Sequence, residues 1–198
     1  NASYCEANPS DAIFVNGVLS SRLVEACVEA RGANYIYLST AHIYSAPLSG
    51  KVSETSAAKN NHPYASSHYI GEQSALYMRD NAKLNALILR LSNAFGVPVN
   101  LKSDCWKLFV NNICMHGVLN NKIDVHSDRR VERNFFAISR LEQVMKEIVA
   151  KNNLATLPSI INIGSLYNCS LEEMTKLVKS SIADNLKQNV YVHHRPLE

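Results

Sequence analysis

The chain has 198 residues, with 20 Lys and Arg against 17 Asp and Glu, and 46% of its residues are hydrophobic. These values are typical of an ordinary globular protein with one domain, or one domain and a small lobe, and they exclude a disordered or fibrous chain. A net charge of +3 is too small to indicate binding to nucleic acid or to an anionic membrane surface. We therefore expect neither nucleic acid nor a membrane as a partner.

The five cysteines are odd in number and widely spaced, and they contain no CxxC pair. This pattern favours neither a disulfide framework nor a zinc ribbon, and no His, Asp and Glu cluster has the spacing of a metal site, so no metal is expected. The opening NASYCEANPSD lacks the segments of a signal peptide, and no apolar run is long enough to span a bilayer. The expected location is the cytoplasm.

The first predicted elements are a helix and a strand. From Pro9 to Arg31, apolar residues recur at helical spacing, and Gly32 then ends the run. YIYLST, residues 35–40, is short, aromatic and β-branched, which predicts a buried strand. A polar loop is expected over residues 46–61.

A second helix and strand follow that loop. Pro63 suits the first position of a helix, which we expect to reach about Asp80. ALILRLS, residues 86–92, predicts another buried strand. Alternating helices and strands imply an α/β fold with parallel strands and right-handed crossovers, whose ligands bind at the carboxyl ends of the strands.

The rest of the chain continues the alternation. Helices are expected over 104–116, over 139–151, and from a capping box of Ser170 and Glu173 towards Ala183. Strands are expected over 122–126 and 159–164, with a possible edge strand over 190–194. An approximate domain boundary separates residues 1–98, which form the sheet, from residues 99–198, mainly a smaller lobe whose elements can return to the sheet.

Four polar side chains are expected near the end of the first strand. Tyr64 and His68 are four residues apart in PYASSHYIGEQ, so on a helix they share one face. Ser39 and Thr40 end the preceding strand, where α/β sheets present functional groups. Taken alone, a Tyr/His pair at this spacing is more often a packed surface feature than a catalytic one, and Thr40 alone would be a strand-end cap.

Three segments taken together resemble the extended short-chain dehydrogenase/reductase family, which includes NAD-dependent sugar-nucleotide epimerases and dehydratases. The segments are LSTAHIYS, PYASSH and LRLSNAFGVP. Family members carry a Ser/Thr just after one strand, a Tyr-x-x-x-Lys helix and an Arg-x-x-Asn-x-x-Gly segment. Thr40, Tyr64, and Arg90 with Asn93 and Gly96 match that order and spacing.

Three further segments extend the resemblance over nearly the whole chain. PSDAIFVNGVLSSRLVEAC, which contains Asn16, resembles the helix before the Ser/Thr strand. RNFFAIS resembles the segment whose arginine, here Arg133, contacts the nucleotide pyrophosphate, and INIGSLYNCSLEEM resembles a late strand leading into a helix. The fold implied is α/β, the second half of a Rossmann-like parallel sheet with a smaller C-terminal substrate lobe.

The resemblance also implies a chemistry. The cofactor would be NAD or NADP and the substrate a nucleotide-activated sugar, with hydride transfer assisted by Tyr64 as acid/base and Thr40 as its hydroxyl partner. The cofactor-binding residues so implied are Asn16, Ser39, Thr40, Tyr64, His68 and Leu91, and the substrate-binding residues are Asn93 and Arg133. A homodimer through the helices over 9–31 and 63–80 is also implied.

Two departures from the family pattern qualify these roles. The Gly-rich loop that binds the pyrophosphate has no counterpart in the 198 residues, so we expect either a piece of a longer protein or a chain whose other half is separate. His68 stands where the family has lysine, and histidine is mostly neutral above pH about 6.5. A tyrosine of pKa about 10 needs a depression of about 3 units to act as a base near neutrality. The sequence therefore predicts a weakened or acid-shifted catalyst.

Other readings remain open at this point. The chain could be a non-catalytic relative that binds a sugar nucleotide or serves as a scaffold, or an interaction module that uses only the helix pair. Asp128 and Glu132 could pair with neighbouring arginines, including Arg133, on a solvated face. Asn93 could be a turn residue before Gly96.

Overall fold

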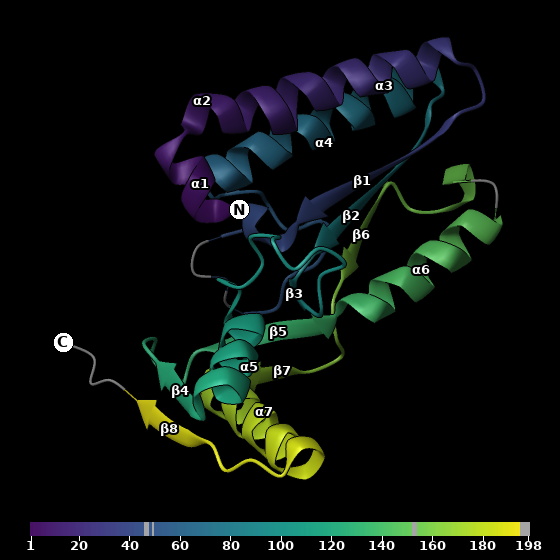
Figure 1. Cartoon of the computed structure of the whole chain (residues 1–198). Helices are drawn as coiled ribbons and strands as arrows, with labels where there is room; N and C mark the ends of the chain where they lie inside the picture. The colour runs from purple at the N-terminus through teal and green to yellow at the C-terminus, as the bar shows by residue number, and fades with distance from the viewer. Residues whose placement is uncertain (46–47, 49, 152–153, 195–198) are drawn as a thin grey trace. The chain divides into compact units, whose positions relative to one another are not determined.

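The computed structural model describes residues 1–45, 48, 50–151 and 154–194, and its elements are drawn in Figure 1. The chain forms two compact units, Asn1–Ser92 with Leu141–Ile163 and Asn93–Arg140 with Gly164–Glu198. This division differs from a single cut after residue 98, because residues 141–163 return to the first unit and add a strand to its sheet. Part of the expected loop over 46–61, namely residues 46, 47 and 49, lies outside the described residues.

The sheet of the first unit is parallel, as the alternation of elements predicts. It consists of β1 (Asn34–Thr40), β2 (Asn85–Leu91) and β6 (Ile160–Ile163), in the order β1-β2-β6. Thr40 lies opposite Leu91 in register, and Leu91 lies opposite Ile163 on the other side. The carboxyl ends of the three strands therefore meet at one edge of the sheet.

A long helical segment precedes β1, built from α2 (Pro9–Ala12), the π-helical η1 (Ile13–Leu19) and α3 (Ser20–Glu29). It ends before the expected Arg31, because Arg31 and Gly32 both adopt positive φ angles, +42° and +82°. A short helix, α1 (Ala2–Ala7), precedes it and was not expected.

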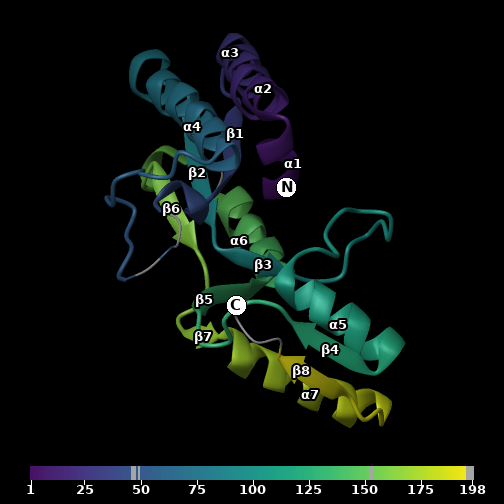
Figure 2. The ribbon, with the colours of Figure 1, turned by 90° about the vertical axis from the view of Figure 1, so that its left-hand side faces the viewer.

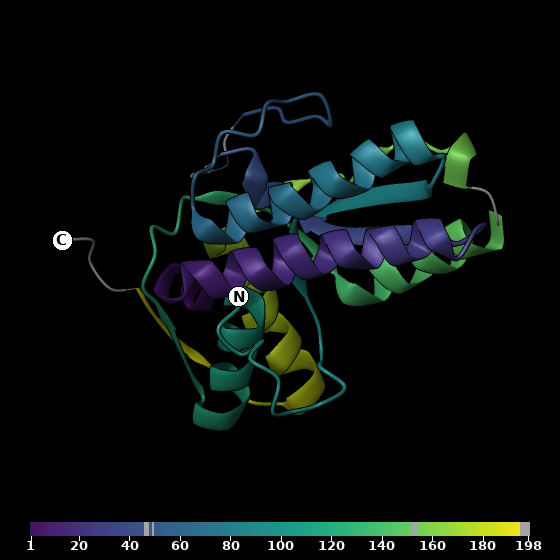
Figure 3. The ribbon, with the colours of Figure 1, turned by 90° about the horizontal axis from the view of Figure 1, so that it is seen from above.

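The helix after the polar loop is α4 (Pro63–Ala82). Viewed from above, α3 and α4 run side by side over β1 and β2 (Figure 3). Between these helices and the sheet lies a core of small and branched side chains: Val24, Tyr37, Ala75, Leu84, Ala86 and Ile88. Small residues of α4 at this contact let the helix approach the strands closely.

The other face of the sheet is covered by the returning helix α6 (Ile138–Lys151), which lies on the opposite side of the strands from α4 (Figures 1 and 2). Leu87 and Leu89 alternate with Ala86 and Ile88 along β2, and all four are at most 1% exposed. A strand buried on both faces explains why ALILRLS is almost continuously apolar.

The second unit contains two small sheets. One has the order β3-β5-β7 and pairs β5 with β7 antiparallel; the other is the parallel pair of β4 and β8. Their bounds are Asn93–Phe95 for β3, Lys122–Val125 for β4, Glu132–Ala137 for β5, Asn168–Ser170 for β7 and Tyr191–His194 for β8. Strands β3, β5 and β7 were not expected, because two are only three residues long and β5 begins with polar residues.

Two helices pack on the sheets of the second unit, α5 (Phe109–Asn120) and α7 (Leu171–Leu186). The helix expected over 104–116 is shifted towards the C-terminus, and the capping box of Ser170 and Glu173 is present. Their apolar faces form a core with β4 and β5: Val110, Ile113, Ile123, Val125, Phe135, Leu171, Val178, Ile182 and Val190. Across the part of the chain that the structure describes, no helix combines the length and the apolarity needed to cross a bilayer.

Candidate active site

The hydroxyls of Tyr64 and Thr40 meet at the carboxyl end of β1. Helix α4 begins at Pro63, and the ring of its N-cap His62 accepts a hydrogen bond from the Tyr64 backbone N–H over 3.2 Å. This start places Tyr64 in the first turn, with its side chain near that of Thr40. Burial raises the pKa of Tyr64, and the nearby Thr40 hydroxyl only partly opposes the shift.

His68 lies one helical turn beyond Tyr64 and packs edge-on against it. The two ring centroids are 4.7 Å apart, with an angle of 72° between the planes. Burial lowers the pKa of His68 to about 4. At neutral pH, His68 therefore carries no charge and cannot depress the pKa of Tyr64 as a lysine ammonium would.

The far side of His68 contacts a tyrosine that the sequence did not single out. The Tyr37 hydroxyl is 3.3 Å from His68 Nδ1 and 3.1 Å from the backbone oxygen of Asn16. Gly71 makes this approach possible, because a Cβ at that position would lie 2.4 Å from the Tyr37 oxygen and 2.5 Å from the Asn16 oxygen. Periodicity marked Tyr37 only as a core residue of β1, since no local pattern shows a contact 31 residues away.

Asn16 links the π-helical segment η1 to α4 by a hydrogen bond. Its side-chain amide donates a hydrogen bond to Ser67 Oγ over 3.0 Å, and Ser67 Oγ donates to the Tyr64 backbone oxygen over 3.1 Å. Asn16 is therefore brought to the first turn of α4, beside Tyr64 and His68. Its side-chain amide is already engaged there in the hydrogen bond to Ser67.

Ser39 and Leu91 complete the group in the first unit. Ser39 is 4% exposed, and within the described residues its hydroxyl has no hydrogen-bond partner. A buried hydroxyl without a partner is costly unless a ligand or water satisfies it. The hydroxyls of Thr40 and Tyr64 and the imidazole of His68 are the other polar groups of this candidate site.

Asn93 and Arg133 belong to the second unit. Asn93 donates a hydrogen bond to the Asn134 backbone oxygen over 3.0 Å, which links β3 to β5. Arg133 is half-buried on β5, and no ion pair or hydrogen bond of its guanidinium is present within the described part of the chain. Asp128 instead pairs with Arg130 over 2.8 Å, so it does not neutralise Arg133.

A buried ion pair on α4 was missed at the sequence level. Arg90 of β2 is 4% exposed, and its guanidinium contacts the Glu72 carboxylate, with Nη2 2.7 Å from Oε2 and Nε 3.0 Å from Oε1. Arg90 also donates to the Tyr44 hydroxyl over 2.8 Å, and Tyr44 donates to Asn162 over 2.7 Å. The signal was an arginine inside an otherwise apolar strand, which needs a buried acidic partner.

The side chains that could ligate a metal ion do not cluster in the part of the chain that the structure describes. Within residues 1–45, 48, 50–151 and 154–194, no group of three or more His, Cys, Asp or Glu is placed to hold a metal ion. The candidate site itself offers the hydroxyls of Ser39, Thr40 and Tyr64 and the neutral imidazole of His68.

Comparison with known proteins identifies the family of the chain. A family model described as the NAD dependent epimerase/dehydratase family matches residues 2–164. The dTDP-D-glucose 4,6-dehydratases of Homo sapiens and Bos taurus are each 27% identical over 189 residues, which is 92% of this chain. The same matches cover 52% of the human protein and 51% of the bovine one, so the chain spans about half the length of these curated relatives.

Solved structures share the fold. The UDP-N-acetylglucosamine 4-epimerase of Methanobrevibacter ruminantium superposes with a TM-score of 0.80 at 18% identity, over 100% of this chain and 61% of that one. The dTDP-glucose 4,6-dehydratase of Streptomyces venezuelae, solved with NAD bound, gives a TM-score of 0.77 at 18% identity, over 99% of this chain and 58% of that one. These likenesses show the fold, a Rossmann-like α/β sheet.

Proposed function

Because the chain belongs to the NAD dependent epimerase/dehydratase family, we propose that it takes part in an NAD(P)-dependent reaction on a nucleotide-activated sugar, with Tyr64 as its acid/base. The observation that carries this proposal is the position of Tyr64 beside Thr40 at the carboxyl end of a parallel sheet. The names of the relatives, which are nucleotide-sugar dehydratases and epimerases, support the substrate class.

In this proposal, each residue has one task. The cofactor supplies the hydride acceptor, and Tyr64 exchanges a proton with the sugar hydroxyl that is oxidised. Thr40 orients that hydroxyl, while Ser39 and His68 bind polar groups of the cofactor beside Leu91 and Asn16. In the second unit, Arg133 and Asn93 bind substrate phosphates. This role is supported by the Arg133 guanidinium, which has no ion pair or hydrogen bond among the described residues.

The neutral state of His68 sets the strength of this catalyst. With the pKa of Tyr64 raised and no cation beside it, the phenolate is scarce at neutral pH. This favours the weakened catalyst over the acid-shifted one, because His68 would gain its charge only near pH 4. It also supports the second candidate, a non-catalytic relative that binds the sugar nucleotide without turning it over.

One experiment separates the two candidates. The protein's intact mass is measured first, and NADH is then titrated by fluorescence, followed by assays with sugar nucleotides. The enzyme proposal expects NADH binding, slow turnover that rises with pH, and a loss of about 100-fold or more in Tyr64→Phe with NADH binding retained. Binding without turnover at any pH would favour the non-catalytic relative, and absence of binding would defeat the cofactor role.

We further propose a homodimer through the segment over 9–31 and helix α4. Support comes from large apolar side chains that are 40–62% exposed on these helices: Ile13, Phe14, Val15, Val18, Leu23, Ile70 and Tyr77. A groove between α3 and α4 is lined by Val24, Ile70, Tyr77 and Met78 among others. Apolar faces of this kind mark protein contacts rather than solvated surface.

Sedimentation tests the dimer. Leu23→Lys places a charge on the exposed face of α3, so we expect it to shift the protein towards monomer at micromolar concentration. Leu119→Lys is the matched control, because Leu119 is 72% exposed on α5 of the second unit. A wild-type protein that sediments as a monomer would contradict the proposal.

A further inference from the structure

The Tyr37 hydroxyl lies between two polar atoms of the first unit. It is 3.1 Å from the Asn16 backbone oxygen and 3.3 Å from His68 Nδ1. Its position is fixed by packing, since Tyr37 is 8% exposed and the Gly71 Cα lies directly against its oxygen. The distances therefore describe a defined arrangement and not a rotating surface hydroxyl.

The hydrogen-bond donors and acceptors of these three groups match in only one arrangement of their protons. A backbone carbonyl can only accept, so the single Tyr37 proton must point at Asn16 to avoid two facing oxygen lone pairs at 3.1 Å. The Tyr37 oxygen is then left to accept a hydrogen bond. Since Tyr37 has no second proton, the contact with His68 is a hydrogen bond only if Nδ1 carries the proton.

From this geometry we propose that Tyr37 is a positioning residue that holds His68 in the Nδ1–H tautomer and so makes Nε2 a hydrogen-bond acceptor. Within the described residues, Nε2 has no hydrogen-bond partner. The lysine expected at this position is a pure donor, whereas the neutral imidazole offers a lone pair. A ligand group that binds His68 must then be a donor, such as a hydroxyl.

This inference rests on the proposed function in one respect, the identity of the ligand that His68 binds. If a nicotinamide nucleotide binds here, its ribose hydroxyls are the donors that an acceptor at Nε2 would select. An acceptor at this position also cannot assist Tyr64 through charge, which agrees with the pKa of His68 being lowered by burial. The tautomer itself is a property of the protein without ligand.

Nitrogen NMR measures the tautomer directly. In protein labelled with ¹⁵N-histidine, long-range proton–nitrogen correlations assign the protonated ring nitrogen of each imidazole, and His68→Gln identifies the signals of His68. At pH 7 we expect a protonated Nδ1 and an unprotonated Nε2. A His68 protonated at Nε2 would overturn the proposal without any variant being needed.

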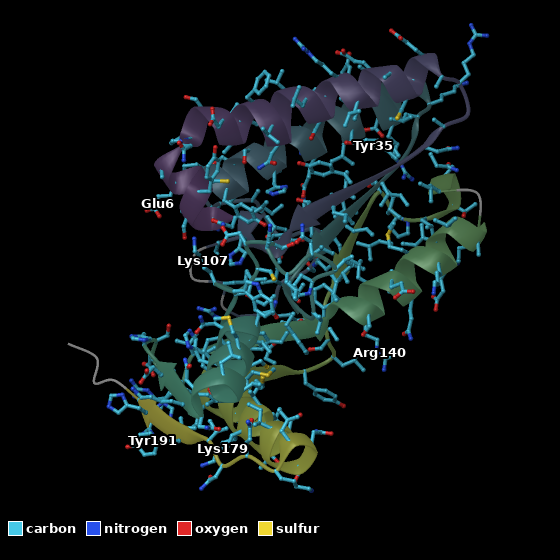
Figure 4. The ribbon with its side chains drawn as sticks, in the orientation of Figure 1. Glu6, Tyr35, Lys107, Arg140, Lys179 and Tyr191 are labelled. Atoms are coloured by element: carbon cyan, nitrogen blue, oxygen red, sulfur yellow. The ribbon has the colours of Figure 1, made fainter. Side chains whose placement is uncertain are left out.

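Two tyrosine variants test whether Tyr37 determines the tautomer of His68. Tyr37→Phe removes the only acceptor that the described residues offer to Nδ1–H, so the population shifts towards the Nε2–H tautomer. Tyr35→Phe is the matched control, because Tyr35 lies on the same strand beneath α3 and α4 (Figure 4) and stacks on Tyr37 with centroids 6.4 Å apart. An unchanged tautomer in Tyr37→Phe would overturn the role of Tyr37.

Addition of NADH separates this inference from the proposed function. If NADH binds, the Nε2 signal of His68 moves as it accepts a hydrogen bond, and binding with no change at Nε2 would refute the acceptor role. Failure to bind NADH would count against the proposed function and leave the tautomer to be decided by the ligand-free spectra.

Discussion

Helix α4 contributes to two polar pairs of opposite character on its sheet-facing side. Near its start, Tyr64 and His68 are neutral, and their pKa values are shifted by burial so that both stay neutral at pH 7. Further along, Glu72 forms a buried ion pair with Arg90 of β2, joined by three hydrogen bonds. Within a few turns, α4 therefore contributes to a buried ion pair and to an uncharged candidate site.

The difference lies in which partners each pair has found. Every strong donor of Arg90 faces Glu72, Tyr44 or the Glu54 backbone oxygen, so the desolvated charges are compensated. At the end of β1, by contrast, the buried hydroxyl of Ser39 has no hydrogen-bond partner within the described residues. Complete satisfaction indicates a structural role, and an incomplete network at the strand ends indicates a place for a ligand.

The largest expected effect comes from breaking the ion pair of Glu72 and Arg90. Glu72→Gln leaves the Arg90 charge buried without its counterion, so we expect the free energy of unfolding to fall by about 3–5 kcal/mol. Denaturant unfolding measures this. In the exposed pair of Glu142 and Lys146, Glu142→Gln should cost at most about 1 kcal/mol, and an equal loss in both variants would remove the distinction.

A second substitution gives the neutral pair a charge. His68→Lys places an ammonium beside Tyr64, and at about 4 Å with an effective dielectric near 20 it can lower the pKa of Tyr64 by about 3 units. Ultraviolet difference titration of the phenolate reports this pKa, with Tyr64→Phe as the blank. His68→Gln is the neutral control and should titrate like the wild type; an unshifted Tyr64 in His68→Lys would contradict the electrostatic account.

The sequence predicted the elements of this site better than their contacts. Strands β1, β2 and β6 and helix α4 were expected within a residue or two, because each has strong periodicity or a clear start signal. The group around Tyr37 was not foreseen, since Asn16, Tyr37 and His68 are far apart in the chain and meet only because Gly71 is small. The pairing of Glu72 with Arg90 was likewise invisible to local patterns.

The short strands of the second unit were missed for another reason. Strand β7 has three residues and β5 starts with Glu132, Arg133 and Asn134, so neither shows an apolar alternation. Their pairing depends on tertiary contacts, including the hydrogen bond from Asn93 to the Asn134 backbone. The role of Arg133 stays a prediction that rests on the resemblance of RNFFAIS to the family segment.

The pH dependence of stability sharpens the comparison further. His68 has a pKa of about 4 when folded and about 6.5 when unfolded, so protonation favours the unfolded chain. Its contribution is fully present above pH about 6.5 and is lost as the pH falls towards about 4, by up to about 3 kcal/mol. Urea unfolding at pH 7, 5.5 and 4 should show a smaller decline in His68→Gln than in the wild type. Identical declines would mean that His68 is not desolvated.

The smallest expected effect tests how tightly the neutral pair is built. In Gly71→Ala, the new Cβ would lie 2.4 Å from the Tyr37 oxygen and 2.5 Å from the Asn16 backbone oxygen, so strand and helix must separate. Overpacking of this kind costs about 1–3 kcal/mol. Gln73→Ala, at an exposed position of the same helix, should stay within about 0.5 kcal/mol of the wild type. Because Gly71 also sets the distance from Tyr37 to His68, the Gly71→Ala protein should show a mixed His68 tautomer, and loss of stability with an unchanged tautomer would separate the packing from the proton arrangement.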